Sequence, residues 1–159
     1  MFNFKLITAS EKSETQKQEK IEITADELSF DDKEKKTIAK GNAIVTHRTE
    51  KGIYILKAYR IEAMQNMDQK QNDDDKKNLF SEIKAIENVS LESDGHKVTA
   101  NHCTYFKTRQ EIICDGNVHI VDIKKGTTIK GNKCKIDLKL EKYYVFSEKK
   151  GKAEIVLFP

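Results

Sequence analysis

One segment of this sequence repeats at a fixed distance. Gly41-Asn42-Ala43-Ile44-Val45 returns 75 residues later as Gly116-Asn117-Val118-His119-Ile120. The same offset relates Ile23-Thr24-Ala25 to Val98-Thr99-Ala100, and no gap is needed between residues 23 and 45. An offset that holds over this length indicates duplicated supersecondary units, which constrains the fold more than any single motif.

Apolar and polar residues alternate within the repeated segments, as in strands that bury one face. Ile21, Ile23 and Ala25 share one side of the first predicted strand. Short strands of this kind follow one another towards the C-terminus, separated by charged turns, and no segment has a helical period. The sequence therefore predicts an all-β fold built from repeated antiparallel hairpins.

The Gly-Asn pair inside each long strand has two interpretations. It forms a two-residue turn, or it forms a bulge or bend within a continuing strand. The alternation keeps its parity across Gly41 and Gly116, which favours the bend. A third, weaker copy covers residues 83–91, with Glu87 in the glycine position. Stacked bent hairpins are typical of a jelly-roll-like or solenoid-like pair of sheets.

Two segments fall outside the strand pattern. Residues 1–20 predict a disordered tail or, on a second interpretation of Leu6–Ser10, the remnant of an export signal. Residues 65–78 include Asp73-Asp74-Asp75 and few apolar side chains, so we expect an exposed polar loop there. Residues 21–159 are predicted to form one domain, and no run of about 18 apolar residues predicts a membrane span.

The charged side chains are interleaved rather than clustered. The chain has 29 basic and 26 acidic residues and a formal net charge of +3. This distribution is not the basic footprint of a nucleic-acid-binding protein, so no nucleic-acid partner is predicted. Neither a nucleophile motif nor a Gly-rich phosphate loop is present, and the sequence predicts no catalytic residues and no cofactor.

The three cysteines are predicted to be small, inward-facing core residues. Cys103, Cys114 and Cys134 are odd in number and irregularly spaced, unlike a secreted disulfide framework. Two of them could pair in an exported protein, and the sequence does not say which. His102 and His119 with two of these cysteines are the only conceivable metal set, but their spacing matches no ligand pattern, so no metal is predicted.

The inward positions of the predicted strands carry simple side chains, mainly Ile, Val, Leu, Ala and Thr. Such side chains either close on one another as an ordinary core or line a cleft between two sheets. A cleft would suit an aliphatic ligand, because each buried methylene stabilises the complex by about 0.8 kcal/mol. One acyl chain of 12–14 carbons would gain roughly 10 kcal/mol before ordering costs.

Both ends of the predicted array lack caps. The first strand, Ile21–Ala25, and the last, Ile155–Phe158, are both apolar, and neither ends in a charge that would blunt an edge. Open arrays need caps or partners, and strand addition from another chain is a natural solution. The C-terminal segment could instead be tucked into its own core.

Several blocks of the sequence, taken in order, resemble the OstA-like domain family. They are Ile21-x-Ile23-x-x-Asp26, Gly41-Asn42-Ala43-x-Val45, Leu56-x-Ala58, Ile129–Lys133, Phe146–Gly151 and Val156–Pro159. The later blocks look most like the periplasmic bridge proteins of lipopolysaccharide export. The resemblance covers residues 21–159 and implies an open, twisted antiparallel β-jellyroll with an apolar groove.

The resemblance also implies partners and site residues. Lipid A acyl chains of lipopolysaccharide would lie in the groove, with an LptC-like protein at the N-terminal edge. An LptD-like protein or another copy would meet the C-terminal edge. The acyl groove is then predicted to be lined by Ile21, Ile23, Ala39, Ala43, Val45, Leu56, Val89, Cys114, Val118, Ile120 and Ile129. The partner edges are predicted to include Ile21, Ile23, Ala25, Ile155, Val156, Leu157 and Phe158.

Three alternatives stay open at the level of sequence. One is another component of the same export system, of the LptC type or the LptD N-terminal type. A second is a sugar-active or metal-dependent jelly-roll enzyme, which would need convergent polar groups inside the groove. The third is a structural β-solenoid, which would need no groove.

Overall fold

The structure, a computed structural model, describes residues 20–65, 80–139, 141–147 and 152–157. Within them, all ten strands belong to one antiparallel sheet, which confirms the all-β, open antiparallel prediction. Apart from Lys20 and Gln65, the predicted tail and polar loop lie outside the described residues. The strands are β1 (Lys20–Thr24), β2 (Glu27–Asp31), β3 (Lys36–Thr49), β4 (Gly52–Met64), β5 (Glu82–Ser93), β6 (His96–Phe106), β7 (Glu111–Asp122), β8 (Thr128–Asp137), β9 (Lys142–Phe146) and β10 (Glu154–Val156).

Each long strand bends near its middle. In β3, Gly41-Asn42 lies opposite the single residue Tyr59 of β4, which is a β-bulge. Glu87-Asn88 and Gly116-Asn117 form the same two-against-one bulge in β5 and β7. All six bulge residues have φ between 48° and 84°. A bend within a continuing strand is therefore confirmed, as is the third copy of the repeat.

Three pairs of predicted short strands turn out to be single bent strands. The sequence predicts only short strands here, whereas β4, β6 and β8 are long and run without a break through residue 59, residues 101–102 and residues 131–132. That prediction was wrong because the even-numbered strands contribute only one unmatched residue to each bulge. Those residues have ordinary negative φ, so the local sequence does not mark the bend.

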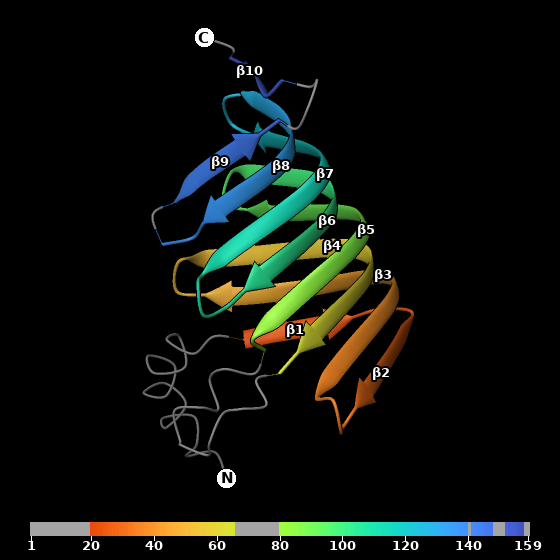
Figure 1. Cartoon of the computed structure of the whole chain (residues 1–159). Coiled ribbons are helices and arrows are strands. Elements are labelled where there is room, and N and C mark those ends of the chain that lie inside the picture. Colours follow the sequence, from red (N-terminus) through yellow and green to blue (C-terminus); the bar gives the residue numbers. More distant parts are fainter. Residues whose placement is uncertain (1–19, 66–79, 140, 148–151, 158–159) are drawn as a thin grey trace, which may run out of the picture.

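The bends fold the sheet into two facing layers (Figure 1). Layer one contains the first halves of β3, β5 and β7 and the second halves of β4, β6 and β8; layer two contains the other halves. At one end, β2 and β1 pair with the two halves of β3 and so take the place of one bent strand. At the other end, β9 and β10 pair with the two halves of β8.

The 75-residue repeat relates β1 and β2 to the two halves of β6, and β3 to β7. Asp26 and Asn101 take equivalent places beside the two bend glycines. A Cβ on Gly41 would lie 2.7 Å from Asp26 Oδ2, and one on Gly116 would lie 2.5 Å from Asn101 Nδ2. Asp26 Oδ2 also accepts a 3.0 Å hydrogen bond from Asn42 Nδ2. The glycines thus provide both the left-handed conformation and the space that the bend requires.

The core fills the space between the layers with aliphatic side chains. Within the described part of the chain, no polar or charged residue is buried. Small side chains concentrate beside the bends, where the layers approach each other most closely. The buried residues nearest the bends include Ala39, Ala43, Ala58, Ala85, Val89, Ala100, Val118 and the three cysteines.

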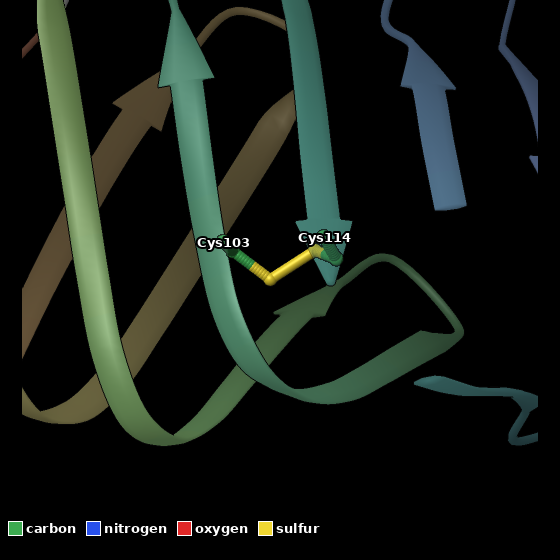
Figure 2. The surroundings of a disulfide bond; sticks show 2 residues. All are labelled: Cys103 and Cys114. Atoms are coloured by element: carbon green, nitrogen blue, oxygen red, sulfur yellow. A yellow bond between two sulfur atoms is a disulfide. The ribbon is translucent and has the colours of Figure 1, made fainter. Parts of the chain in front are cut away.

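The three cysteines form one row across β6, β7 and β8. Cys114 is the register partner of Cys103 on one side and of Cys134 on the other. A disulfide joins Cys103 to Cys114 (Figure 2), and Cys134 is a buried free thiol. Burial raises the pKa of the Cys134 thiol to about 12. Their prediction as inward-facing core residues is confirmed, and the structure adds which two pair.

Candidate functional site

An aliphatic row crosses the inner face of layer two from one end of the stack to the other. Each member is the register partner of the next, and each comes from a different strand. The alternation of the strands places all of these side chains on the same face. The row consists of Ile23, Val45, Leu56, Leu91, Val98, Ile120, Ile129 and Ile155.

A first cavity of about 420 Å³ lies between the layers. Val45, Leu56 and Leu91 of the aliphatic row form its layer-two wall. Its size falls within the range of roughly 300–1,000 Å³ that is typical of small-molecule sites. The other lining residues are His47, Thr49, Glu50, Lys51, Tyr54, Ile83, Cys103, Tyr105, Lys107, Gln110, Ile112 and Leu138.

A second cavity of about 450 Å³ adjoins the first. The two cavities share five lining residues that come from both layers: Lys51, Tyr54, Leu91, Ile112 and Leu138. The rest of its lining is more polar and consists of Gly52, Ile53, Ser93, Asp94, His96, Val98, Ile136, Asp137, Glu141 and Tyr143. The cavities therefore form two segments of one cleft along the margin opposite the bends.

Histidine and tyrosine rings meet across this margin. The ring of His47 on β3 lies 6.5 Å from that of Tyr105 on β6, and the His96 ring stacks on Tyr143 of β9 at 5.5 Å. Each pair joins layer two to layer one. Burial is the main cause that raises the pKa of Tyr143. These pairs place polarisable rings, rather than aliphatic groups, where the cleft opens.

Asp122 stands beside the second of these pairs, with its carboxylate 3.8 Å from His96 Nε2. The backbone N–H of Lys125, with that of Lys124, holds the pKa of Asp122 below its ordinary value. The carboxylate therefore stays ionised over the neutral range and keeps this part of the margin negative.

The residues predicted to line an acyl groove fall into two groups. Val45 and Leu56 line the first cavity. Among the others, Ala39, Ala43, Val89, Cys114, Val118 and Ile120 are almost fully buried in the core, whereas Ile21, Ile23 and Ile129 are half-buried and pack against it. Parity identified the inner face, but only part of that face borders open space.

Sequence reasoning missed most of the cavity wall. Ile83, Leu91, Tyr105, Ile112 and Leu138 line the first cavity and were not predicted. They lie further along the strands from the bends than the predicted alanines. Distance from the Gly-Asn pair was the available signal, because a wedge between two bent layers widens away from the bends.

The fold does not bring together the conceivable metal set of His102, Cys103, Cys114 and His119. Two of its members, Cys103 and Cys114, are bonded to each other, and His102 points to the opposite face of β6 from its neighbour Cys103. Across the described residues, no three His, Cys, Asp or Glu side chains are grouped to hold a metal ion. The described residues also contain no helix long and apolar enough to cross a membrane.

Exposed apolar side chains gather at the two ends of the stack. At the β2 end, Leu28 and Phe30 are 55% and 53% exposed, and at the β10 end Ile155 is 56% exposed. These residues have the parity of the inner face, and none of the strands in the described residues extends beyond them to cover them. Of the predicted edge residues, Phe158 lies outside the described residues.

The fold resembles that of one solved periplasmic protein over most of its length. The crystal structure of LptH from Pseudomonas aeruginosa, described as the LptA homologous periplasmic component of the lipopolysaccharide transport device, matches with a TM-score of 0.70. The identity is 16%, and the match covers 88% of this chain and 96% of LptH. This similarity supports the fold, and no curated protein matches the sequence.

The sequence itself provides the family assignment. Residues 22–142 match the family model described as LptA/(LptD N-terminal domain) LPS transport protein. The matched region extends from β1 to the first residue of β9, and so includes all three bulges, the first cavity and every lining residue of the second cavity except Tyr143. The resemblance to OstA-like domains is thus confirmed, and the chain belongs to the LptA/LptD N-terminal domain family of lipopolysaccharide transport proteins.

Proposed function

We propose that this protein is a periplasmic lipopolysaccharide carrier that bridges the inner and outer membranes. The observation that carries the proposal is the cleft between the layers, whose first cavity is walled by Val45, Leu56, Leu91, Ile83 and Ile112. Aliphatic walls of this kind suit an acyl chain, since burial of each methylene is favourable. The ligand is therefore the lipid A part of lipopolysaccharide, with its acyl chains between the layers.

The bridging part of the proposal is supported by the two ends of the stack, where the described part of the chain provides no capping strand. The aliphatic row extends to Ile23 on β1 and to Ile155 on β10, so a strand added at either end would continue it. We assign the β1–β2 edge to an LptC-like partner and the β9–β10 edge to an LptD-like partner or a second copy. The Cys103–Cys114 disulfide supports a location in the oxidising periplasm.

A matched pair of variants on β4 tests the carrier function. Leu56 faces the first cavity, whereas its neighbour Ile55 faces the other side of the sheet. We expect Leu56→Gln to weaken lipopolysaccharide binding about tenfold or more, because an amide would be desolvated beside the acyl chain. Ile55→Gln should leave the affinity unchanged. Binding is measured by fluorescence titration, and the fold of each variant by circular dichroism.

Two results would count against a lipid carrier. In one, the purified protein fails to bind lipopolysaccharide at all. In the other, folded Leu56→Gln protein binds as well as the wild type.

A further inference from the structure

The two cavities differ in the charge of their linings. The charged side chains of the first are Glu50, Lys51 and Lys107, so cations outnumber anions. The second has Lys51 too, but three carboxylates accompany it: Asp94, Asp137 and Glu141. His96 also lines the second cavity, and its Nε2 lies 3.8 Å from the carboxylate of Asp122, which stays ionised. One end of the cleft is thus suited to an anion and the other is not.

The two lysines of the first cavity come from opposite layers. Lys51 lies in the β3–β4 turn, where its backbone N–H donates a 3.1 Å hydrogen bond to Thr49 Oγ1. Lys107 follows β6, and its backbone is held by bonds from its N–H to Ser81 and from the Gln110 N–H to its own carbonyl. Backbone hydrogen bonds therefore hold both turns, and both lysines line the cavity from segments outside the strands that provide the aliphatic wall.

The position of these lysines matches what an amphiphile needs. An acyl chain between Val45, Leu56 and Ile112 would leave its polar end at the margin, since no polar residue is buried deeper in the described core. Lysine binds phosphate as a compact point charge that donates several hydrogen bonds. A phosphate at the margin would meet one ammonium group from each layer.

We propose that the margin between Lys51 and Lys107 binds the phosphate of an acylated lipid whose chain fills the first cavity. The inference rests on the proposed carrier function, which it deepens by assigning a place and a chemical class to the head group. The acidic lining of the second cavity repels the same phosphate, so the charge difference fixes the orientation of the lipid along the cleft.

The test compares phosphorylated lipid A with the same lipid A after phosphatase treatment. Wild-type protein should bind the phosphorylated form about tenfold more tightly, as expected for charge-assisted hydrogen bonds. The double variant Lys51→Gln with Lys107→Gln should lose that preference while it keeps its affinity for the dephosphorylated lipid. Replacement of both lysines by arginine should restore much of the preference.

A matched control uses Lys40→Gln with Lys57→Gln, one exposed lysine from each layer. Neither residue lines a cavity, so this pair lowers the net charge equally and should leave the preference intact. A loss in this control as large as in the test pair would mean that only net charge matters, and would overturn the inference.

Other outcomes separate the inference from the proposed function. Equal wild-type binding of both lipids would overturn the phosphate site and leave acyl binding standing. Failure to bind either lipid would overturn both. If inorganic phosphate alone protects Lys51 and Lys107 from amine-reactive labelling as well as the lipid does, the site binds free anions and the inference is wrong.

Discussion

Glu62 is the centre of a small ion network on the outer face of layer one. Its carboxylate accepts a 3.0 Å contact from Lys36 Nζ and a 2.7 Å contact from Arg60 Nε. Burial alone would raise the pKa of Glu62, but the hydrogen bonds and charges of the two cations outweigh it and hold the pKa below its ordinary value of 4.5. A carboxyl group with a lowered pKa in the folded state contributes stability that is lost in acid.

We therefore expect Glu62→Gln to lower the free energy of unfolding by about 1 kcal/mol at pH 7. The contribution is fully present above pH 4.5 and disappears as the pH falls through the lower folded-state pKa, so the variant and the wild type should converge in acid. Urea unfolding at several pH values measures the difference. Glu92→Gln, in an exposed pair 3.8 Å from Lys97, is the control and should have little effect. A difference that does not depend on pH would contradict the assignment.

Cys114 illustrates what residue-level reasoning from sequence missed. Parity predicted that all three cysteines face inward, but the choice of pair depends on the register between β6, β7 and β8. That register depends on the bulges, and the single residues of β6 and β8 that lie opposite them are not marked in the sequence. Both neighbours of Cys114 are cysteines, so only the structure distinguishes the Cys103 pair from the Cys134 pair.

Removal of the disulfide by Cys103→Ala with Cys114→Ala should cost about 2–3 kcal/mol of unfolding free energy, because the cross-link closes a short loop. Reductant should lower the stability of the wild type to a similar level, and it should have no effect on the double variant. Urea unfolding with and without dithiothreitol provides the measurement. A wild-type stability that is indifferent to reductant would show that the bond does not form.

At the scale of the elements, the bend of a long strand requires both a left-handed backbone and space for it. Gly41 and Gly95 have nearly the same φ, 82° and 79°, but different surroundings. A Cβ at Gly41 would press on Asp26, whereas the nearest atom to one at Gly95 is Lys124 Cε at 3.9 Å. A substitution at Gly95 therefore tests the cost of the left-handed backbone alone. A substitution at Gly41 tests that cost together with the steric contact with Asp26.

We expect Gly95→Ala to cost about 1–2 kcal/mol from the left-handed backbone alone. Gly41→Ala should cost roughly 2–4 kcal/mol, because the contact with Asp26 adds to the backbone term. Chemical denaturation of both variants tests the ranking. Gly41→Ala combined with Asp26→Gly should recover part of the difference, and equal losses in the two single variants would rule out a steric role for Asp26.

The elements also show how far sequence patterns reach. The bends of β3 and β7 were predicted because Gly-Asn pairs and preserved parity mark them, and β5 was predicted as a weaker copy of the same segment with Glu87 in the glycine position. The inner face was predicted as well, but the position of the cleft was not. Ala39 and Ala43 were placed in the groove by parity, yet they lie beside a bend where the two layers close on each other. The depth of a wedge is a property of both layers together, which no single strand pattern contains.

At the scale of the whole molecule, the described strands leave an open sheet edge at each end of the stack. Ile155 on β10 and Ile53 on β4 are similarly exposed, at 56% and 46%, but only Ile155 lies on an edge strand. If copies join by strand addition, Ile155→Lys should weaken self-association, whereas Ile53→Lys should not. Sedimentation velocity over a range of concentrations measures this. An equal effect of the two variants would place the contact elsewhere.

The split end strands have a consequence for symmetry. The pairs β1–β2 and β9–β10 each take the place of one bent strand, and the six bent strands β3 to β8 lie between them. The described stack therefore contains an even number of bent strands. The first and last therefore run in opposite directions. A copy added by translation along the stack would present its first strand antiparallel to the last strand of its neighbour, with inner face meeting inner face. An odd number would force a parallel junction, so strand parity makes this molecule a repeating unit that can be extended without a change of pairing rule.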